Sequence, residues 1–262
     1  MMIRQPKQLF PPETQSGFTI IECLLGIILV SILLTAIAPV IALSVATRVQ
    51  ARRVEQATQA AKSYIDGVRA GKIAPPQNIV VVKPNKTNET NDPNTALFTG
   101  AAGAAAPVGQ PGWDCLPVDP ENPNNSYCKT PAGTAAVYCI GLDDTPGCNS
   151  GSSRDFIIQP LRSVRPAPSD ISGTTADPSD NGNEGYILGV RVYRTDALDG
   201  SITLQTAKPV NNVRAAAYTG GAGNRSLPLV EMTTEIRTGS TDYASFCDRL
   251  GGCTTPIPPA AP

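Results

Sequence analysis

The chemistry open to this sequence is bounded first by what it lacks, because the chain contains no histidine. Histidine is the commonest general base and the commonest metal ligand in proteins. Neither a nucleophile–base triad nor a plausible pair of catalytic carboxylates takes its place. The sequence therefore predicts a protein that is not an enzyme and that needs no cofactor. Its formal net charge of −1 also argues against binding to nucleic acid.

Six of the seven cysteines lie in the downstream part of the chain, in stretches rich in Gly, Pro and Asn. They are Cys115, Cys128, Cys139, Cys148, Cys247 and Cys253. No two form a C-x-x-C pair, so zinc is not favoured. An even number in loop-rich sequence predicts three disulfides and an oxidising compartment, the alternative being free thiols in a cytosolic protein. The sequence does not determine the pairing, and the simplest one joins neighbours: 115–128, 139–148 and 247–253.

One short loop, residues 177–185, is rich in oxygen ligands. Its polar side chains are Asp177, Asp180, Asn181, Asn183 and Glu184. Loops of this composition can hold Ca²⁺, but the EF-hand spacing is absent. The favoured interpretation is a solvated polar loop with no metal, and calcium is the minor alternative.

The first strong structural feature of the chain is an apolar run over residues 18–47. Its single charge is Glu22. The run exceeds the roughly 20 residues that a helix needs to span a bilayer. A signal peptide fits poorly, because the run is too long for its apolar region and the small-residue sites come late, at 36–38 and 44–46.

The charges that flank the apolar run do not settle its orientation. Arg48, Arg52 and Arg53 follow it, whereas Arg4 and Lys7 precede it. A bare count would place the C-terminal side in the cytoplasm, while the predicted disulfides place it outside. Long domains translocate largely regardless of charge, so we expect the C-terminal part to be extracytoplasmic.

The pattern after residue 48 predicts that the helix continues as an amphipathic one. Apolar residues recur at spacings of three and four: Ala51, Val54, Ala57, Ala61, Ile65 and Val68. Gly71 and the prolines at 75–76 end the helix. We expect this half to pack on the rest of the protein.

Short alternating segments downstream predict an antiparallel sheet. The expected strands are residues 79–82, 135–141, 155–159, 186–194, 201–205 and 228–237. Asp199-Gly200 is expected to form a hairpin turn. Inward positions are Tyr186, Leu188, Val190 and Val192 in one strand and Val230, Met232, Thr234 and Ile236 in another. The predicted class is α+β, a long N-terminal helix packed on a loop-rich, disulfide-bonded antiparallel sheet.

The start of the apolar run closely resembles the class III signal of type IV prepilins and type II secretion pseudopilins. A short polar leader ends in Gly17, Phe18 follows, and Glu22 is the fifth residue counted from Phe18. The resemblance implies a pilin-like fold, cleavage after Gly17 by a prepilin peptidase and N-methylation of Phe18. The composition is also similar to that of pseudopilins of filamentous cyanobacteria that take part in polysaccharide secretion during gliding.

The same resemblance implies roles for Glu22 and Pro39. In the family the glutamate is thought to pair with the N-terminal amine of a neighbouring subunit, and this pairing sets the stagger of helices in the filament core. An unpaired carboxylate within a bilayer costs about 2.5–3.5 kcal/mol on insertion scales. Pro39 removes a backbone hydrogen bond, so it either lets the next segment melt in a filament or produces an ordinary kink. Cys23 is expected to be only a small apolar side chain in the membrane.

The predicted organisation has five parts. They are a leader (1–17), a membrane and filament-core helix (18–47), an amphipathic helix (48–74), an extracytoplasmic β-rich domain (75–253) and a disordered tail (254–262).

The implied function is that of a minor pilin or pseudopilin. The implied partners are other such subunits, the prepilin peptidase, an inner-membrane assembly platform and the membrane. The implied location is the inner membrane first and then a filament in the periplasm or at the cell surface. The alternative is a membrane-anchored extracytoplasmic binding module whose helix stays uncleaved.

Overall fold

The structure, a computed structural model, describes part of the chain. The described residues are 17, 19–82, 98, 107, 115, 127–129, 135–143, 147–148, 151–152, 154–167, 169, 175–197, 202–206, 224–241 and 243. Residues 1–16, Phe18, Asp199-Gly200, Cys247, Cys253 and the expected tail at 254–262 lie outside them.

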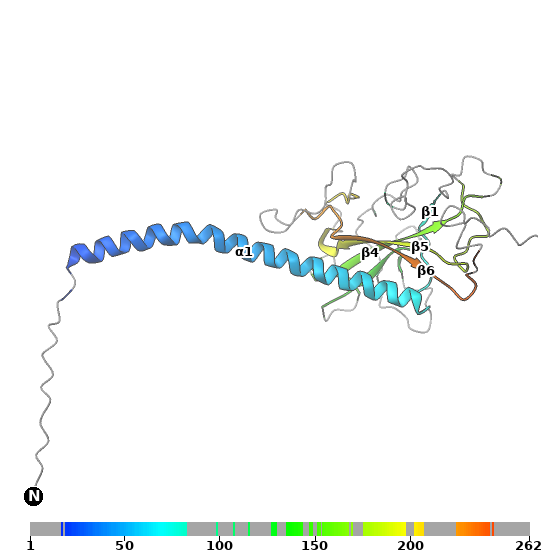
Figure 1. The fold of residues 1–262 in the computed structure, drawn as a ribbon, viewed down its shortest axis with the longest axis horizontal. Helices are drawn as coiled ribbons and strands as arrows, with labels where there is room; N and C mark the ends of the chain where they lie inside the picture. Colours follow the sequence, from blue (N-terminus) through cyan, green and yellow to red (C-terminus); the bar gives the residue numbers. More distant parts are fainter. Residues whose placement is uncertain are drawn as a thin grey trace, which may run out of the picture. The chain divides into compact units, whose positions relative to one another are not determined.

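The described residues form one long helix and one sheet, the α+β combination expected from the sequence (Figure 1). The elements are α1 Ile20–Arg69, β1 Ile79–Val81, β2 Cys128–Lys129, β3 Ala135–Ile140, β4 Phe156–Val164, β5 Tyr186–Arg194, the 3₁₀ turn η2 Thr195–Ala197 and β6 Val230–Ile236. The chain divides into two compact units, one ending at Ala46 and one beginning at Thr47.

The sheet is mixed, which corrects the prediction of a wholly antiparallel one. Strands β2, β3, β4, β5 and β6 follow one another in antiparallel order, while β1 pairs in parallel with β4. Two strands pair along the same edge of the long strand β4. Ile158 pairs with Tyr138 of β3, and Arg162 pairs with Ile79 of β1. The parallel strand is possible because residues 82–155 separate it from β4, which is ample for a crossover.

Pro160 lies in the middle of β4, a position that proline usually avoids because it has no N–H to donate to the ladder. Its carbonyl oxygen accepts a hydrogen bond from Asn78 Nδ2 at 3.1 Å, so its backbone faces the edge shared by β3 and β1. The pairing with β3 ends at Ile158 and that with β1 begins at Arg162. The missing N–H therefore falls in the gap between the two partner strands and costs no ladder hydrogen bond.

The second half of α1 covers one face of the sheet (Figure 1). All four inward positions predicted for β5 belong to this core, and β6 contributes Ile236, Val230 and Met232. The buried residues of α1 are Gln50, Ala57, Ala60, Ala61, Tyr64, Ile65 and Val68. Ala51 and Val54, predicted to face the sheet, are instead exposed. At that level Gln50 is buried and Arg53 is half-buried instead.

Two tyrosines tie the core to the segment that follows α1. Tyr127 donates its hydroxyl proton to the Ala74 carbonyl at 2.5 Å, so Tyr64 is the donor in the 2.9 Å bond between the two hydroxyls. Burial raises the pKa of Tyr64 well above its usual value. Both hydroxyls are thus satisfied inside an apolar cluster, as buried polar groups must be.

The helix ends at Gly71, as the sequence predicted, with a well-defined C-cap. Gly71 has a φ of 67°, a left-handed conformation that glycine adopts without strain. The N–H of Lys72 bonds to the Gly67 carbonyl at 3.0 Å, and that of Gly71 bonds to the Val68 carbonyl at 3.0 Å. This pair of bonds is the Schellman motif, which satisfies carbonyls at the helix end.

The expected strand at 201–205 is absent from the described residues of that stretch, 202–206. They run as an irregular segment instead, with Leu204 buried in a cluster with Tyr193 and Ile157. The carbonyl of Gln205 accepts the Tyr193 hydroxyl at 3.1 Å, and its N–H donates to the Ser226 carbonyl at 2.7 Å. The place beside β5 is taken by β6, which pairs with it over seven positions from Tyr186 to Val192.

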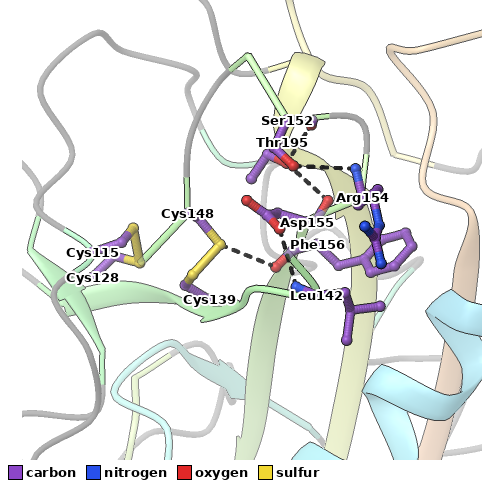
Figure 2. The surroundings of a disulfide bond; sticks show 10 residues. All are labelled: Cys115, Cys128, Cys139, Leu142, Cys148, Ser152, Arg154, Asp155, Phe156 and Thr195. Atoms are coloured by element: carbon purple, nitrogen blue, oxygen red, sulfur yellow. Dashed lines mark hydrogen bonds between the residues drawn. A yellow bond between two sulfur atoms is a disulfide. The ribbon is translucent and has the colours of Figure 1, made fainter. Parts of the chain in front are cut away.

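Two disulfides close loops beside this second cluster (Figure 2). They join Cys115 to Cys128 and Cys139 to Cys148, two of the three neighbour pairs expected from the sequence. The third expected pair lies outside the described residues. Near the second bond, Asp155 accepts the Leu142 N–H at 3.1 Å and its carbonyl accepts the Thr195 hydroxyl at 2.8 Å, so the connection between β3 and β4 is held at several points.

Candidate processing and assembly site

The segment around the predicted cleavage point lies immediately before α1. Gly17 is exposed, and a Cβ placed on it would meet no atom within 4 Å. Phe18, the predicted site of methylation, is outside the described residues. The helix begins at Ile20, and the Thr19 carbonyl accepts hydrogen bonds from the N–H groups of Glu22 at 3.0 Å and Cys23 at 3.2 Å. Two residues of the chain, Phe18 and Thr19, therefore lie between the Gly17–Phe18 bond and the first residue of α1.

Glu22 is exposed in the first turn of α1. Thr19 stands at the N-cap position and Glu22 three residues later, which is the spacing of a capping box. An acidic side chain near a helix N-terminus is stabilised by about 0.3–1 kcal/mol. This is less than the 2.5–3.5 kcal/mol that a carboxylate costs within a bilayer. The helix start therefore offsets only part of the cost. Thr19 was missed in the sequence interpretation, although its Thr-x-x-Glu spacing is readable there.

The surface of α1 around and beyond Glu22 is apolar on every side. From Ile20 to Val49 every residue except Ala46 is exposed, with Ile20 at 86% and Leu34 at 64%. The segment is long and apolar enough to cross a membrane by length and composition, which suggests membrane anchoring or a signal sequence. No other charged residue precedes Arg48 in this stretch.

Pro39 lies inside α1, and the helix continues through it. Proline cannot bond to the carbonyl four residues earlier, which here belongs to Thr35. One turn before, the Thr35 hydroxyl donates to the Ser31 carbonyl at 2.8 Å and the Ser31 hydroxyl donates to the Ile27 carbonyl at 2.7 Å. These bonds satisfy hydroxyl groups that an apolar environment would otherwise leave without partners. Pro39 and Glu22 are on the same helix, about 25 Å apart at 1.5 Å per residue, so they form separate features.

A shallow hollow lies on the surface of α1 near Glu22. It is lined by Cys23, Gly26, Ile27, Val30 and Ser31. Gly26 has no side chain, and a Cβ there would meet nothing within 4 Å. Cys23 is a free, exposed thiol. The hollow is a place where another helix could approach closely.

The loop at 177–185, the calcium candidate, holds its acids against arginines. Asp180 pairs with Arg162 at 3.3 Å and accepts the Arg165 N–H at 3.0 Å. Glu184 pairs with Arg165 at 2.7 Å. Asp177 accepts both the N–H and the hydroxyl of Ser179, which lowers its pKa.

The two asparagines of this loop take part in hydrogen bonds to its backbone. Asn181 caps the Asn183 N–H at 3.0 Å, and the Asn183 carbonyl accepts hydroxyl groups from Thr238 and Ser240. Within the described part of the chain, no group of three or more Cys, Asp or Glu side chains is placed to hold a metal ion. Three acids of the loop are thus engaged by groups of the chain: Asp180 and Glu184 by arginines and Asp177 by Ser179.

Comparisons with protein families, with curated proteins and with solved structures found no match to this chain.

Proposed function

We propose that this protein is a non-catalytic subunit of a type IV pilus or of a type II secretion-like filament, a minor pilin or pseudopilin. It is cleaved after Gly17, methylated at Phe18 and assembled through α1. The single observation that carries the proposal is Glu22, the only charge on a predominantly apolar helix surface that is otherwise uncharged from Ile20 to Thr47. A prepilin peptidase, an inner-membrane assembly platform and other subunits of this kind are its partners.

A carboxylate exposed on an apolar helix needs a positive partner that arrives from outside the chain. The position of Glu22 at the helix N-terminus leaves roughly 2 kcal/mol of the insertion cost uncompensated. Cleavage after Gly17 would create an α-amine at Phe18, and methylation would leave that amine cationic. The amine of a neighbouring subunit then neutralises Glu22 and sets the axial stagger between helices.

The hollow beside Glu22 supports packing of one helix against another. Membrane helices associate through close backbone approach at small residues and through polar contacts, because lipid tails provide no hydrophobic driving force between them. Gly26 and Ser31 supply the small residues of such a face, on the same stretch of helix as Glu22.

Processing tests this proposal with a matched pair of variants. Co-expressed with a prepilin peptidase, the wild-type chain is expected to shorten by its leader, whereas Gly17→Val stays at precursor length because the peptidase requires the small residue before the cut. Electrophoresis of membrane fractions measures both. Gly26→Val makes the same substitution nine residues downstream, also at an exposed glycine with open space around it, and should be processed normally.

Two outcomes would contradict the proposal. If the wild-type chain keeps its leader in the presence of active peptidase, the protein is a membrane-anchored binding module instead. If Gly17→Val is shortened as readily as the wild type, the cut is not at the predicted bond.

A further inference from the structure

Two Tyr-Cys pairs in neighbouring strands connect α1 with the two disulfides. Tyr127 stands immediately before β2 and is followed by Cys128, and Tyr138 is followed by Cys139 in β3. Neighbouring residues of a strand point to opposite faces of a sheet. The tyrosines accordingly pack in the core cluster shared with α1, whereas the cysteines lie in the second cluster on the other face. Each disulfide thus lies behind an aromatic side chain of the helix-facing core.

Tyr127 is the side chain that joins these strands to the end of α1. Its hydroxyl donates to the Ala74 carbonyl at 2.5 Å and accepts the Tyr64 hydroxyl at 2.9 Å, and the residue is 6% exposed. Its ring also makes an edge-on contact with Tyr138, with 6.1 Å between the ring centroids. Ala74 follows the Schellman motif that ends the helix, so Tyr127 fixes the point where the chain leaves α1.

The strand pairing beside Tyr127 is too short to hold it in this place. β2 has two residues and lies at one end of the order of described strands, with an irregular register between Cys128 and Lys129. A strand pair with so few ladder bonds is marginal by itself. The disulfide joins Cys128 covalently to Cys115, 13 positions earlier. We therefore attribute the position of Tyr127 to the disulfide more than to the ladder.

The other end of this covalent link, Cys115, is fixed by the loop of the second disulfide, which lies beside the first (Figure 2). Gly147 comes so close that a Cβ placed on it would lie 2.4 Å from the Cys115 carbonyl oxygen. Its φ of 82° is a conformation that glycine adopts without strain. Cys115 also packs against the second cluster. The link to Tyr127 therefore begins at a residue that the sheet holds in place.

We propose that the Cys115–Cys128 disulfide is a redox-sensitive lock on the end of α1. In the oxidised protein the disulfide keeps Tyr127 against Ala74 and Tyr64, and its reduction releases Tyr127 and opens the turn that follows the helix. The inference does not rest on cleavage, methylation or filament assembly, so it can fail while the proposed function stands.

The reductant of this lock is a dithiol. Two electrons and two protons pass from it to the two cysteine sulfurs, so the protein S–S bond breaks and an S–S bond forms in the reductant. The attacking thiolate reaches Cys115 first, because Cys115 is half-buried whereas Cys128 is 2% exposed. Cys128 then leaves as the thiolate, and the second thiol of the reductant releases Cys115.

The release is confined to the end of the helix. Earlier turns of α1 stay in the core cluster through Ala57 and Ala61. After the turn, the Pro76 carbonyl accepts Arg162 Nε of β4 at 3.3 Å. Neither contact involves β2, so the chain between the last turn of α1 and Pro76 is the part that loses its support.

Hydrogen–deuterium exchange of the folded full chain in detergent, with and without dithiothreitol, tests the lock. The amides of residues 70–73 donate to carbonyls of the last helical turns. After reduction they are expected to exchange about a hundredfold faster, from the closure entropy of a loop of this length. Amides within β4 and β5 should keep their rates. Unchanged exchange at 70–73, or equal acceleration across β4 and β5, would overturn the proposal.

Three variants identify the bond and the side chain responsible. Combined Cys115→Ser and Cys128→Ser should exchange fast at 70–73 without reductant and show no response to it, whereas the matched pair Cys139→Ser and Cys148→Ser should still respond. Tyr127→Phe keeps the ring but loses both hydroxyl bonds, so reduction should accelerate its exchange less than that of the wild type. A full response in the first pair or in Tyr127→Phe, or no response in the second pair, would contradict the lock.

Discussion

Changing Glu22 to alanine is expected to abolish incorporation of the protein into filaments while leaving its insertion into the membrane intact. Insertion should become easier, because the substitution removes a carboxylate that costs about 2.5–3.5 kcal/mol within the bilayer. Assembly should fail, because on the proposed function the neighbouring subunit's amine loses its partner. Fractionation of cells expressing the variant measures insertion, and sheared or purified filaments measure incorporation.

Two control variants make the Glu22 result specific. Glu22→Gln keeps the size and the hydrogen-bonding capacity of the side chain but not its charge, so it should fail in assembly as alanine does. Glu55→Ala removes an exposed acid from the same helix outside the apolar segment and should assemble normally. Normal assembly of Glu22→Ala would show that the carboxylate is an N-terminal helix stabiliser with no role between subunits.

Removal of Arg191 is expected to destabilise the globular unit by about 3–5 kcal/mol, the range for breaking a buried ion pair by deleting one partner. Its side chain is fully buried. The guanidinium donates to Glu231 at 2.8 Å, to Gln159 at 3.4 Å and to the Phe98 carbonyl at 3.2 Å, and it lies 5.0 Å from the Phe98 ring centroid. Arg191→Ala would leave the Glu231 carboxylate without this partner in a largely buried site.

Urea unfolding of the full chain in detergent, followed by a probe of the sheet, measures this loss. Arg237→Ala is the matched control, because Arg237 is 68% exposed and pairs with Glu235 at 3.6 Å. Exposed pairs contribute at most about 1 kcal/mol, so that variant should remain close to wild type. A loss below 1 kcal/mol for Arg191→Ala would show that the contacts of Arg191 with Gln159 on β4 and Glu231 on β6 do not stabilise the sheet.

Elements that depend on local pattern were predictable. The helix, its end at Gly71 and the strands at 135–140, 186–194 and 230–236 follow from spacing and from turn residues. The inward face of β5 was also correct, because strict alternation assigns side chains to faces without knowledge of the partner strand.

Features that depend on distant partners were not predictable. Residues 79–81 carry no sign that they pair in parallel with β4, and nothing local places residues 202–206 outside the sheet. The row of Gln159, Arg191 and Glu231 arises from cross-strand register between residues 32 and 40 positions apart. Likewise, Ala51 and Val54 fit an apolar stripe by spacing, but both are exposed and Gln50 is the buried residue at that level.

The candidate site was readable from sequence because it is contiguous. Gly17, Glu22 and Pro39 lie along one stretch of chain, so their order and separation need no tertiary information. The role of Glu22 depends on a second subunit, which neither the sequence nor the fold of one chain contains.

The mass of the N-terminal peptide of the mature protein, isolated from membranes of cells with an active prepilin peptidase, tests the central claim most directly. The account predicts a peptide that begins at Phe18 and carries one added methyl group on its amine. A mature chain that still carries residues 1–17, or that begins at any other residue, would contradict it.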